Sequence, residues 1–235
     1  MRTNRNRIVI VRDVVYRYPV LVQDQRSILI HAENQRMAAR AGLPVPEVLD
    51  VAEDGPEPHI VMRRAAGTPL METTLGDAAS AVLAERLAEF LTALWGVEDW
   101  APPAVPWPEL WDALDRAVGE PQTSRAALIA ACAPVRPSHG DLSPGNLMVE
   151  TDGRLNAVLD WDAATRSDPA TDFSALCANT PPKVAEQLRR IVPESSDLDA
   201  RAQAYLDTWP AQNRLWQADA HPWLVGDEPV SHPRV

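Results

Sequence analysis

The stretch from His139 to Asp172 constrains this chain more than any other, because it places several reactive side chains at short, fixed spacings. Asp141 and Asn146 are separated by four residues in His-Gly-Asp-Leu-Ser-Pro-Gly-Asn. Two short apolar runs follow, at 147–150 and 155–159, joined by Thr-Asp-Gly, and they predict a β-hairpin that ends at Asp160. Since a hairpin returns the chain to its starting point, we expect Asn146 and Asp160 to lie side by side.

These spacings indicate a particular chemistry. An Asp followed by an Asn after four residues is the spacing of a phosphoryl-transfer catalytic loop. Asp141 is the candidate to orient and deprotonate an attacking hydroxyl, while Asn146 and Asp160 offer the oxygen ligands that Mg²⁺ prefers. The spacing alone is common by chance. The hairpin, the Asp at its end and the following Asp168-Pro-Ala-Thr-Asp172 make the combination specific.

Composition narrows the class of protein. A chain of 235 residues with 46% apolar content can bury one large core or two small lobes. Residues 1–70 hold ten Lys and Arg against eight Asp and Glu, and the remainder holds twelve against twenty-five. An acidic second part argues against nucleic acid as a partner. It would suit a cationic small substrate, with plain solubility as the alternative.

Neither a membrane span nor a secretion signal is expected. No apolar run reaches the length of about 18 residues that a spanning helix needs. The two cysteines, Cys132 and Cys177, show no metal or redox spacing, which favours reduced thiols in a cytoplasmic protein. The sequence leaves the oligomeric state open.

Residue patterns divide the chain into two parts. The first third predicts strands at 7–11, 14–18, 47–51 and 59–62, with a helix at 25–41. Beyond Asp77, helical spacing predicts helices at 78–95, 109–118, 124–132, 171–178, 183–191 and 198–216. We therefore expect an α+β fold with a small, β-rich N-lobe at 1–68 and a larger helical C-lobe at 69–235. The hinge would lie between Met62 and Pro69, with the site between the lobes.

The segment from Ser138 to Leu176 resembles the aminoglycoside phosphotransferase and choline-kinase-like family, whose fold is similar to that of the eukaryotic-type protein kinases. His139-Gly140-Asp141 stands where protein kinases have His-Arg-Asp, and Leu159-Asp160-Trp161-Asp162 stands where they have Asp-Phe-Gly. The resemblance implies a two-lobed, protein-kinase-like fold. It also implies a Mg²⁺-dependent enzyme that moves the γ-phosphate of ATP or GTP to a hydroxyl of a small molecule, such as an aminoglycoside-like or choline-like amine.

The resemblance extends into the N-lobe, where it implies a nucleotide site. Arg17 stands where the family has a strand Lys or Arg that contacts phosphates, and Glu33 is the implied helix partner of that cation. The strand ending at Met62 resembles the segment whose backbone binds adenine, which implicates Met62 and Arg64.

Three further residues have implied or candidate roles. The resemblance implies that Asp172 accepts backbone N–H bonds from the catalytic loop, and His139 is expected to fix that loop by hydrogen bonds. Asp162 is a candidate to line the acceptor pocket or to lie near the metal, with a solvated loop residue as the alternative.

Two departures from the family support a rival hypothesis. The family's first strand and phosphate-covering loop have no counterpart before Thr3, and no glycine precedes Tyr16. Either the N-lobe is truncated or the phosphates are held more openly. Arg17 also replaces a compact ammonium by a wider, planar fork. The rival is a catalytically impaired relative that binds a nucleotide or ligand without turnover.

Overall fold

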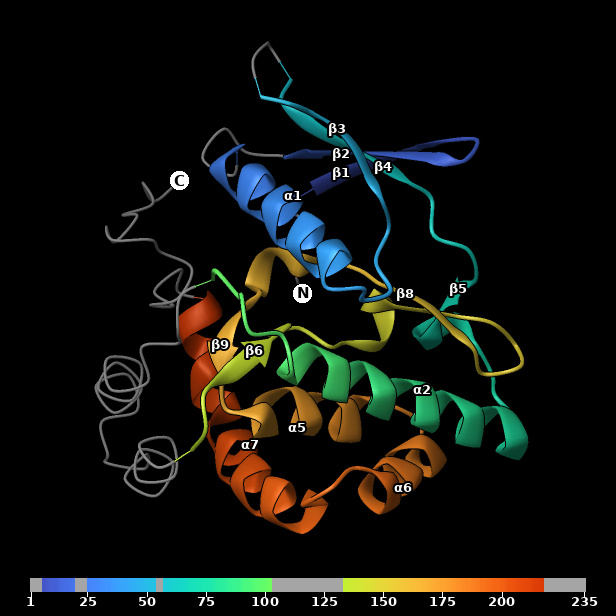
Figure 1. The fold of residues 1–235 in the computed structure, drawn as a ribbon, viewed down its shortest axis with the longest axis vertical. Helices are drawn as coiled ribbons and strands as arrows, with labels where there is room; N and C mark the ends of the chain where they lie inside the picture. Colours follow the sequence, from blue (N-terminus) through green and yellow to red (C-terminus); the bar gives the residue numbers. More distant parts are fainter. Residues whose placement is uncertain (1–5, 20–24, 54–56, 103–132, 218–235) are drawn as a thin grey trace.

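The computed structural model describes residues 6–19, 25–53, 57–102 and 133–217 (Figure 1). The helices predicted at 109–118 and 124–132 lie outside the described residues. Within the described ranges, an N-terminal sheet with one helix stands above a larger, mainly helical part, which confirms the expected α+β class.

The N-terminal sheet has four antiparallel strands in the order β1-β2-β4-β3. Their bounds are β1 (Asn6–Val11), β2 (Val14–Pro19), β3 (Val48–Ala52) and β4 (His59–Arg63). Helix α1 (Gln25–Arg40) packs on one face of the sheet, and Ile28, Ala32, Ile60 and Met62 form a small core between them. Branched and aromatic side chains dominate β1 and β2, as the sequence predicted.

The larger core belongs to the C-terminal helices. They are α2 (Asp77–Trp95), α5 (Pro169–Asn179), α6 (Pro182–Ile191) and α7 (Ser195–Gln217). In α2 the fully buried Leu83, Leu87, Leu91 and Leu94 recur every three or four residues, the period that predicted this helix. Within the described residues, no helix is both long and apolar enough to cross a membrane.

Short strands link the two parts and position the functional loops. The predicted hairpin is present as β7 (Leu147–Val149) and β8 (Leu155–Val158), and β5 (Thr68–Pro69) pairs with β7. A second pair joins β6 (Arg136–Ser138) to β9 (Thr165–Ser167). The sequence did not predict β5, β6 or β9, because two or three residues are too few to show alternation.

The tight turn of the β7–β8 hairpin requires a glycine. Gly153 has φ of 88°, and a Cβ there would lie 2.0 Å from the backbone oxygen of Ala79 in α2. Gly42 has a similar φ of 76°, but nothing lies within 4 Å of its Cβ position. The two glycines therefore separate backbone strain from steric collision.

We expect Gly153→Ala to lower the free energy of unfolding by more than about 2 kcal/mol, because the left-handed backbone alone costs an alanine about 1–2 kcal/mol. Gly42→Ala is the control and should show only the backbone cost. Chemical denaturation of both variants measures the difference. Equal losses in the two variants would show that α2 moves away from the hairpin without cost.

Candidate active site

The loop from His139 to Asn146 is held by a buried carboxylate beneath it. Asp172 is 1% exposed and accepts hydrogen bonds from the backbone N–H groups of His139 (2.9 Å) and Gly140 (3.1 Å), as expected. Gly140 has φ of 80°, and a Cβ would lie 2.4 Å from the carbonyl oxygen of Ala163. The sharp turn before Asp141 thus depends on this glycine.

His139 is buried and neutral. Its Nδ1 accepts a hydrogen bond from the backbone N–H of Asp141 (3.2 Å), so its Nε2 carries the hydrogen and donates it to the carbonyl of Leu159 (2.9 Å). Burial lowers the pKa of His139, more than the nearby Asp172 and Asp141 carboxylates raise it. The ring therefore ties the loop to the end of the hairpin, in agreement with the supporting role expected of it.

Asn146 and the hairpin end meet through the backbone. The carbonyl of Asn146 accepts a hydrogen bond from the N–H of Leu159 (2.8 Å), one residue before Asp160. The Asn146 side chain donates through Nδ2 to the carbonyl of Asp141 (2.9 Å). Among the described residues nothing donates to its Oδ1, so this oxygen and the Asp160 carboxylate are two hard donors on neighbouring segments. This donor set suits Mg²⁺.

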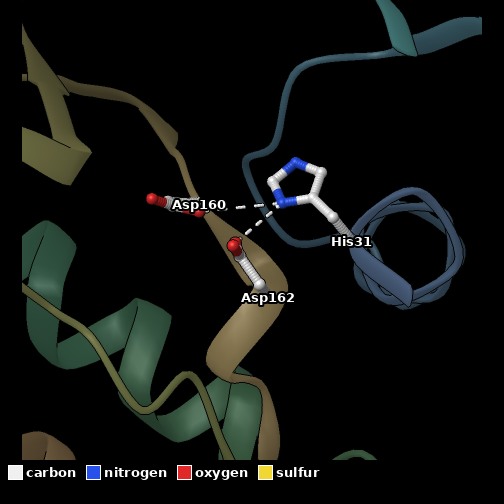
Figure 2. Close-up of side chains that lie close together, drawn as sticks. All are labelled: His31, Asp160 and Asp162. Carbon is white, nitrogen blue, oxygen red and sulfur yellow. Dashed lines mark hydrogen bonds and ion pairs between the residues drawn. The ribbon is translucent and has the colours of Figure 1, made fainter. Parts of the chain in front are cut away.

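Asp160 and Asp162 flank a side chain that is anchored in the core. Trp161 is fully buried, and its indole N–H donates to the carbonyl of Val158 (2.9 Å). Asp160 has a left-handed backbone with φ of 64°. One oxygen of each carboxylate lies near Nδ1 of His31, which α1 supplies, as Figure 2 shows.

Arg17 on β2 reaches across to both carboxylates. Its NH1 donates to Asp160 Oδ1 (3.0 Å) and its NH2 to Asp162 Oδ2 (2.9 Å), while the residue is only 6% exposed. NH1 also lies 2.8 Å from Nδ1 of His31 on α1. The amide of Asn6, turned with its oxygen inward, accepts from the same guanidinium at 2.7 Å from NH2.

The expected pair of Arg17 with Glu33 is wrong. Glu33 is exposed, and its carboxylate pairs with Arg40 at 3.1 Å. The reason is helical geometry: Glu33 is two residues from His31, about 200° around the helix axis, so it faces away from the site. His31 occupies the position on α1 that reaches the guanidinium, and sequence reasoning missed it because an isolated histidine carries no spacing signal.

A second polar side chain of α1 fixes the tautomer of His31. Nε2 of His31 lies 2.8 Å from Gln35 Oε1, and Gln35 Nε2 donates to the carbonyl of Pro46 (2.6 Å). Gln35 therefore presents an acceptor, which requires the hydrogen on Nε2. Burial, and then the charge of Arg17, lower the pKa of His31, so the ring is neutral and its Nδ1 accepts from Arg17.

The two carboxylates differ in acidity. Burial, followed by the neighbouring Asp162, raises the pKa of Asp160 to about 7. Burial acts in the same direction on Asp162, but a hydrogen bond with Asp160 and the charge of Arg17 hold its pKa well below the usual range. Asp162 is thus the more acidic of the pair. Its side chain is 36% exposed, as in a solvated loop residue, but it is also held by the ion pair with Arg17.

Nδ1 of His31 and one oxygen from each carboxylate lie within 4.8 Å of one another, close enough to share a metal ion (Figure 2). In the structure the guanidinium of Arg17 already places its positive charge on both carboxylates. A metal ion at this triad would compete with Arg17 for them.

The strand expected to bind adenine is partly engaged within the sheet. Met62 is buried, and its sulfur accepts from Gln35. The backbone N–H of Arg64 donates to the carbonyl of Asp13 (2.7 Å), so this donor is not available to a base, contrary to the expected role of Arg64. The cause is the β1–β2 turn, whose carbonyl lies over the end of β4.

The comparisons with known proteins agree with this arrangement. The model of the phosphotransferase enzyme family, APH, matches residues 3–211. The apoenzyme of macrolide 2′-phosphotransferase MphH from Brachybacterium faecium is 20% identical with a TM-score of 0.74, covering 100% of this chain and 91% of that chain. The GDP and kanamycin complex of APH(2″)-IIIa is 19% identical with a TM-score of 0.71, covering 95% and 87%.

Two further likenesses complete the comparison. A choline/ethanolamine kinase family protein from Mesorhizobium loti is 21% identical with a TM-score of 0.69, covering 98% of this chain and 80% of that chain. Uncharacterized protein YcbJ of Bacillus subtilis (strain 168) is 46% identical over 35 residues, which span 15% of this chain and 11% of that protein. The structural likenesses show a protein-kinase-like fold, and the match over residues 3–211 shows that the chain belongs to the APH phosphotransferase family.

Proposed function

We propose that this protein is a Mg²⁺-dependent kinase that transfers the γ-phosphate of ATP or GTP to a hydroxyl group of a small molecule. The observation that carries the proposal is the loop around Asp141. It is fixed from below by Asp172 and His139 and joined through Asn146 to the strand that ends at Asp160. A ligand-binding relative without turnover would not need this loop to be so fully supported.

Asp141 would orient the acceptor hydroxyl and take its proton as the oxygen attacks the γ-phosphorus. The bond between that phosphorus and the bridging oxygen breaks, and the nucleoside diphosphate leaves. The protein mainly positions groups and neutralises charge in such a transfer. Bound Mg²⁺ would neutralise phosphate charge, and Asn146 Oδ1 with the Asp160 carboxylate would hold it.

The inner face of the N-terminal sheet suits a nucleotide base. Ile10 lies opposite Val15 in the β1–β2 register, and Val15 lies opposite Met62. By strand alternation these side chains share a face with Arg17, and Ile10 is 52% exposed. An apolar strip next to a buried guanidinium would accept a base on the strip and its phosphates at Arg17. In this proposal Met62, which was expected to bind the base, packs beneath the strip instead.

We propose a cationic acceptor, in keeping with the acidic part beyond residue 70, which holds twelve Lys and Arg against twenty-five Asp and Glu. The related solved structures include a kanamycin complex, a macrolide 2′-phosphotransferase and a choline/ethanolamine kinase family protein. Aminoglycosides and choline carry positive charge and should be tested first.

The test is acceptor-dependent ATP and GTP consumption with an aminoglycoside, a macrolide and choline, with Mg²⁺ and with chelator. We expect turnover with at least one cationic acceptor and none after chelation. Asp160→Asn should bind Mg-nucleotide more weakly and lose turnover by at least about a hundredfold. Tight nucleotide binding without turnover on any acceptor of a broad panel would instead support the binding-only relative.

A further inference from the structure

Arg17 does not pair with Glu33, the helix partner that the family resemblance implied. Its anionic partners are Asp160 and Asp162 instead. The only acidic residue of α1 is Glu33, which is exposed and bound to Arg40. The inward face of α1 presents neutral groups instead, namely His31, Asn34 and Gln35. The negative charge at Arg17 comes from the opposite lobe, from Asp160 and Asp162.

The two carboxylates cannot serve Arg17 equally when a metal ion is present. Asp160 is the residue at the hairpin end, beside the Asn146 oxygen, so it is the carboxylate that a metal ion would take. Asp162 bonds the other terminal nitrogen of the guanidinium, NH2, at 2.9 Å, and its second oxygen lies 3.0 Å from His31 Nδ1. Asp162 can therefore keep its bond to Arg17 after Asp160 turns to a metal.

The fork of an arginine makes this arrangement possible. A guanidinium presents separate N–H groups in one plane and can bind two acceptors at once, whereas an ammonium is a single point charge. NH1 of Arg17 meets Asp160 and His31, and NH2 meets Asp162. An arginine at this strand position, rather than a lysine, is thus what allows one cation to bind two carboxylates of the other lobe.

Helix α1 holds the acidic segment as well as the guanidinium. Nδ2 of Asn34 donates to the carbonyl of Trp161 (2.9 Å), the residue between the two carboxylates. His31 contributes a neutral acceptor, and a glutamate in its place would add a third carboxylate against a single guanidinium. The neutral histidine is therefore what the local charge balance favours.

We propose that Asp162 is the anionic positioning residue that holds Arg17 toward the nucleotide phosphates, and that His31 is the neutral acceptor for Arg17 on α1. This inference rests on the proposed function. It assigns separate tasks to the two carboxylates: Asp160 belongs to the metal, and Asp162 belongs to Arg17. Glu33, the family-like brace expected from the sequence, has no part in it.

The test is the equilibrium affinity for ATP, measured by calorimetry with and without Mg²⁺, which needs no acceptor. We expect Asp162→Asn to weaken ATP binding about tenfold in both conditions, the loss of one charge-assisted contact to a charged group. The benefit of Mg²⁺ should persist in Asp162→Asn and vanish in Asp160→Asn. Asp162→Glu, which keeps the charge, should recover most of the affinity.

A double-mutant cycle shows whether Asp162 acts through Arg17. In an Arg17→Met background, Asp162→Asn should have no further effect on ATP affinity. His31→Phe should weaken binding in the same direction, with thermal unfolding as its check on folding. Glu33→Gln and the exposed Glu85→Gln on α2 are matched neutralisations that should bind ATP like the wild type.

Three outcomes would overturn the inference: unchanged or tighter ATP binding by Asp162→Asn, an equal loss in the Arg17→Met background, or a loss in Glu33→Gln that exceeds the loss in Asp162→Asn. Each leaves the proposed kinase function standing. A wild-type protein that binds no nucleotide at all removes both proposals, so the two failures are distinguishable.

Discussion

Replacing Asp141 by Asn should lower kcat for phosphoryl transfer by about 10²–10⁴-fold, the usual contribution of a positioned general base. The affinity for Mg-nucleotide should stay within about twofold of the wild type. The expected result is thus a loss confined to the chemical step, because in the proposed mechanism Asp141 serves the acceptor and the proposed metal ligands Asn146 and Asp160 are untouched.

The loop should keep its shape in this variant, because the backbone hydrogen bonds of Asp141 do not involve its carboxylate. The N–H of Asp141 donates to His139 Nδ1, and its carbonyl accepts from Asn146 Nδ2 and from the N–H of Ser143 (2.9 Å). An Asn side chain is also close in size to Asp. A change in kcat therefore reports the lost carboxylate and not a displaced loop.

Steady-state kinetics with the best acceptor, together with calorimetry of nucleotide binding, measure the two quantities. Asp152→Asn, which removes an exposed carboxylate from the hairpin turn of the same lobe, is the control and should behave like the wild type. A kcat within threefold of the wild type would remove Asp141 from the catalytic role. A parallel loss of nucleotide binding would place Asp141 at the metal instead.

Elements defined by local sequence were predictable. The β7–β8 hairpin follows from two apolar runs around Asp152-Gly153, and α2 follows from its leucine period. Each of these two signals lies within one short, continuous stretch of sequence. The supporting bonds of Asp172 were also expected, because the resemblance supplied the fold that brings it beneath the loop.

The partner of Arg17 was not predictable, because it depends on contacts between residues more than 140 positions apart. The apolar period of α1 is weak because its inward face holds His31, Asn34 and Gln35, while Ile30 is 47% exposed. A pattern that departs from ordinary amphipathicity in this way is itself a signal: polar residues at helical spacing on a short helix indicate a site beneath it.

The second large expected effect is on stability, and it concerns a cluster of Asp168, Arg201 and Tyr205. No local sequence pattern predicted this cluster. Asp168 is 1% exposed and caps α5 by accepting from the N–H of Ala170 (2.9 Å). It also accepts from Arg201 Nε (2.8 Å) and NH2 (3.1 Å), and from the hydroxyl of Tyr205 (2.9 Å). Burial and the Asp168 charge raise the pKa of Tyr205, so its hydroxyl remains a donor.

Asp168→Ala should destabilise the protein by about 3–5 kcal/mol, because it removes the cap of α5, the buried partner of Arg201 and the acceptor of the Tyr205 hydroxyl. The remaining partner of Arg201, Asp197, is exposed. At this chain length the loss corresponds to a fall in Tm of about 6–20 °C. Asp168→Asn should lose less, since the amide oxygen can still cap α5. Denaturant and thermal unfolding measure both variants.

The control is a change at Asp199 on α7, the helix that carries Arg201. Asp199 pairs with Arg189 at 2.8 Å, but both side chains are more than a third exposed, so Asp199→Asn should cost less than about 1 kcal/mol. A loss below 1 kcal/mol in Asp168→Ala would show that water replaces the lost acceptor and that α7 is not anchored here. Because Asp168 begins the helix whose Asp172 holds the catalytic loop, Asp168→Asn should also lower kcat while Asp199→Asn leaves it unchanged. A stable but slow Asp168→Asn would show that the cluster positions the loop as well as stabilising the fold.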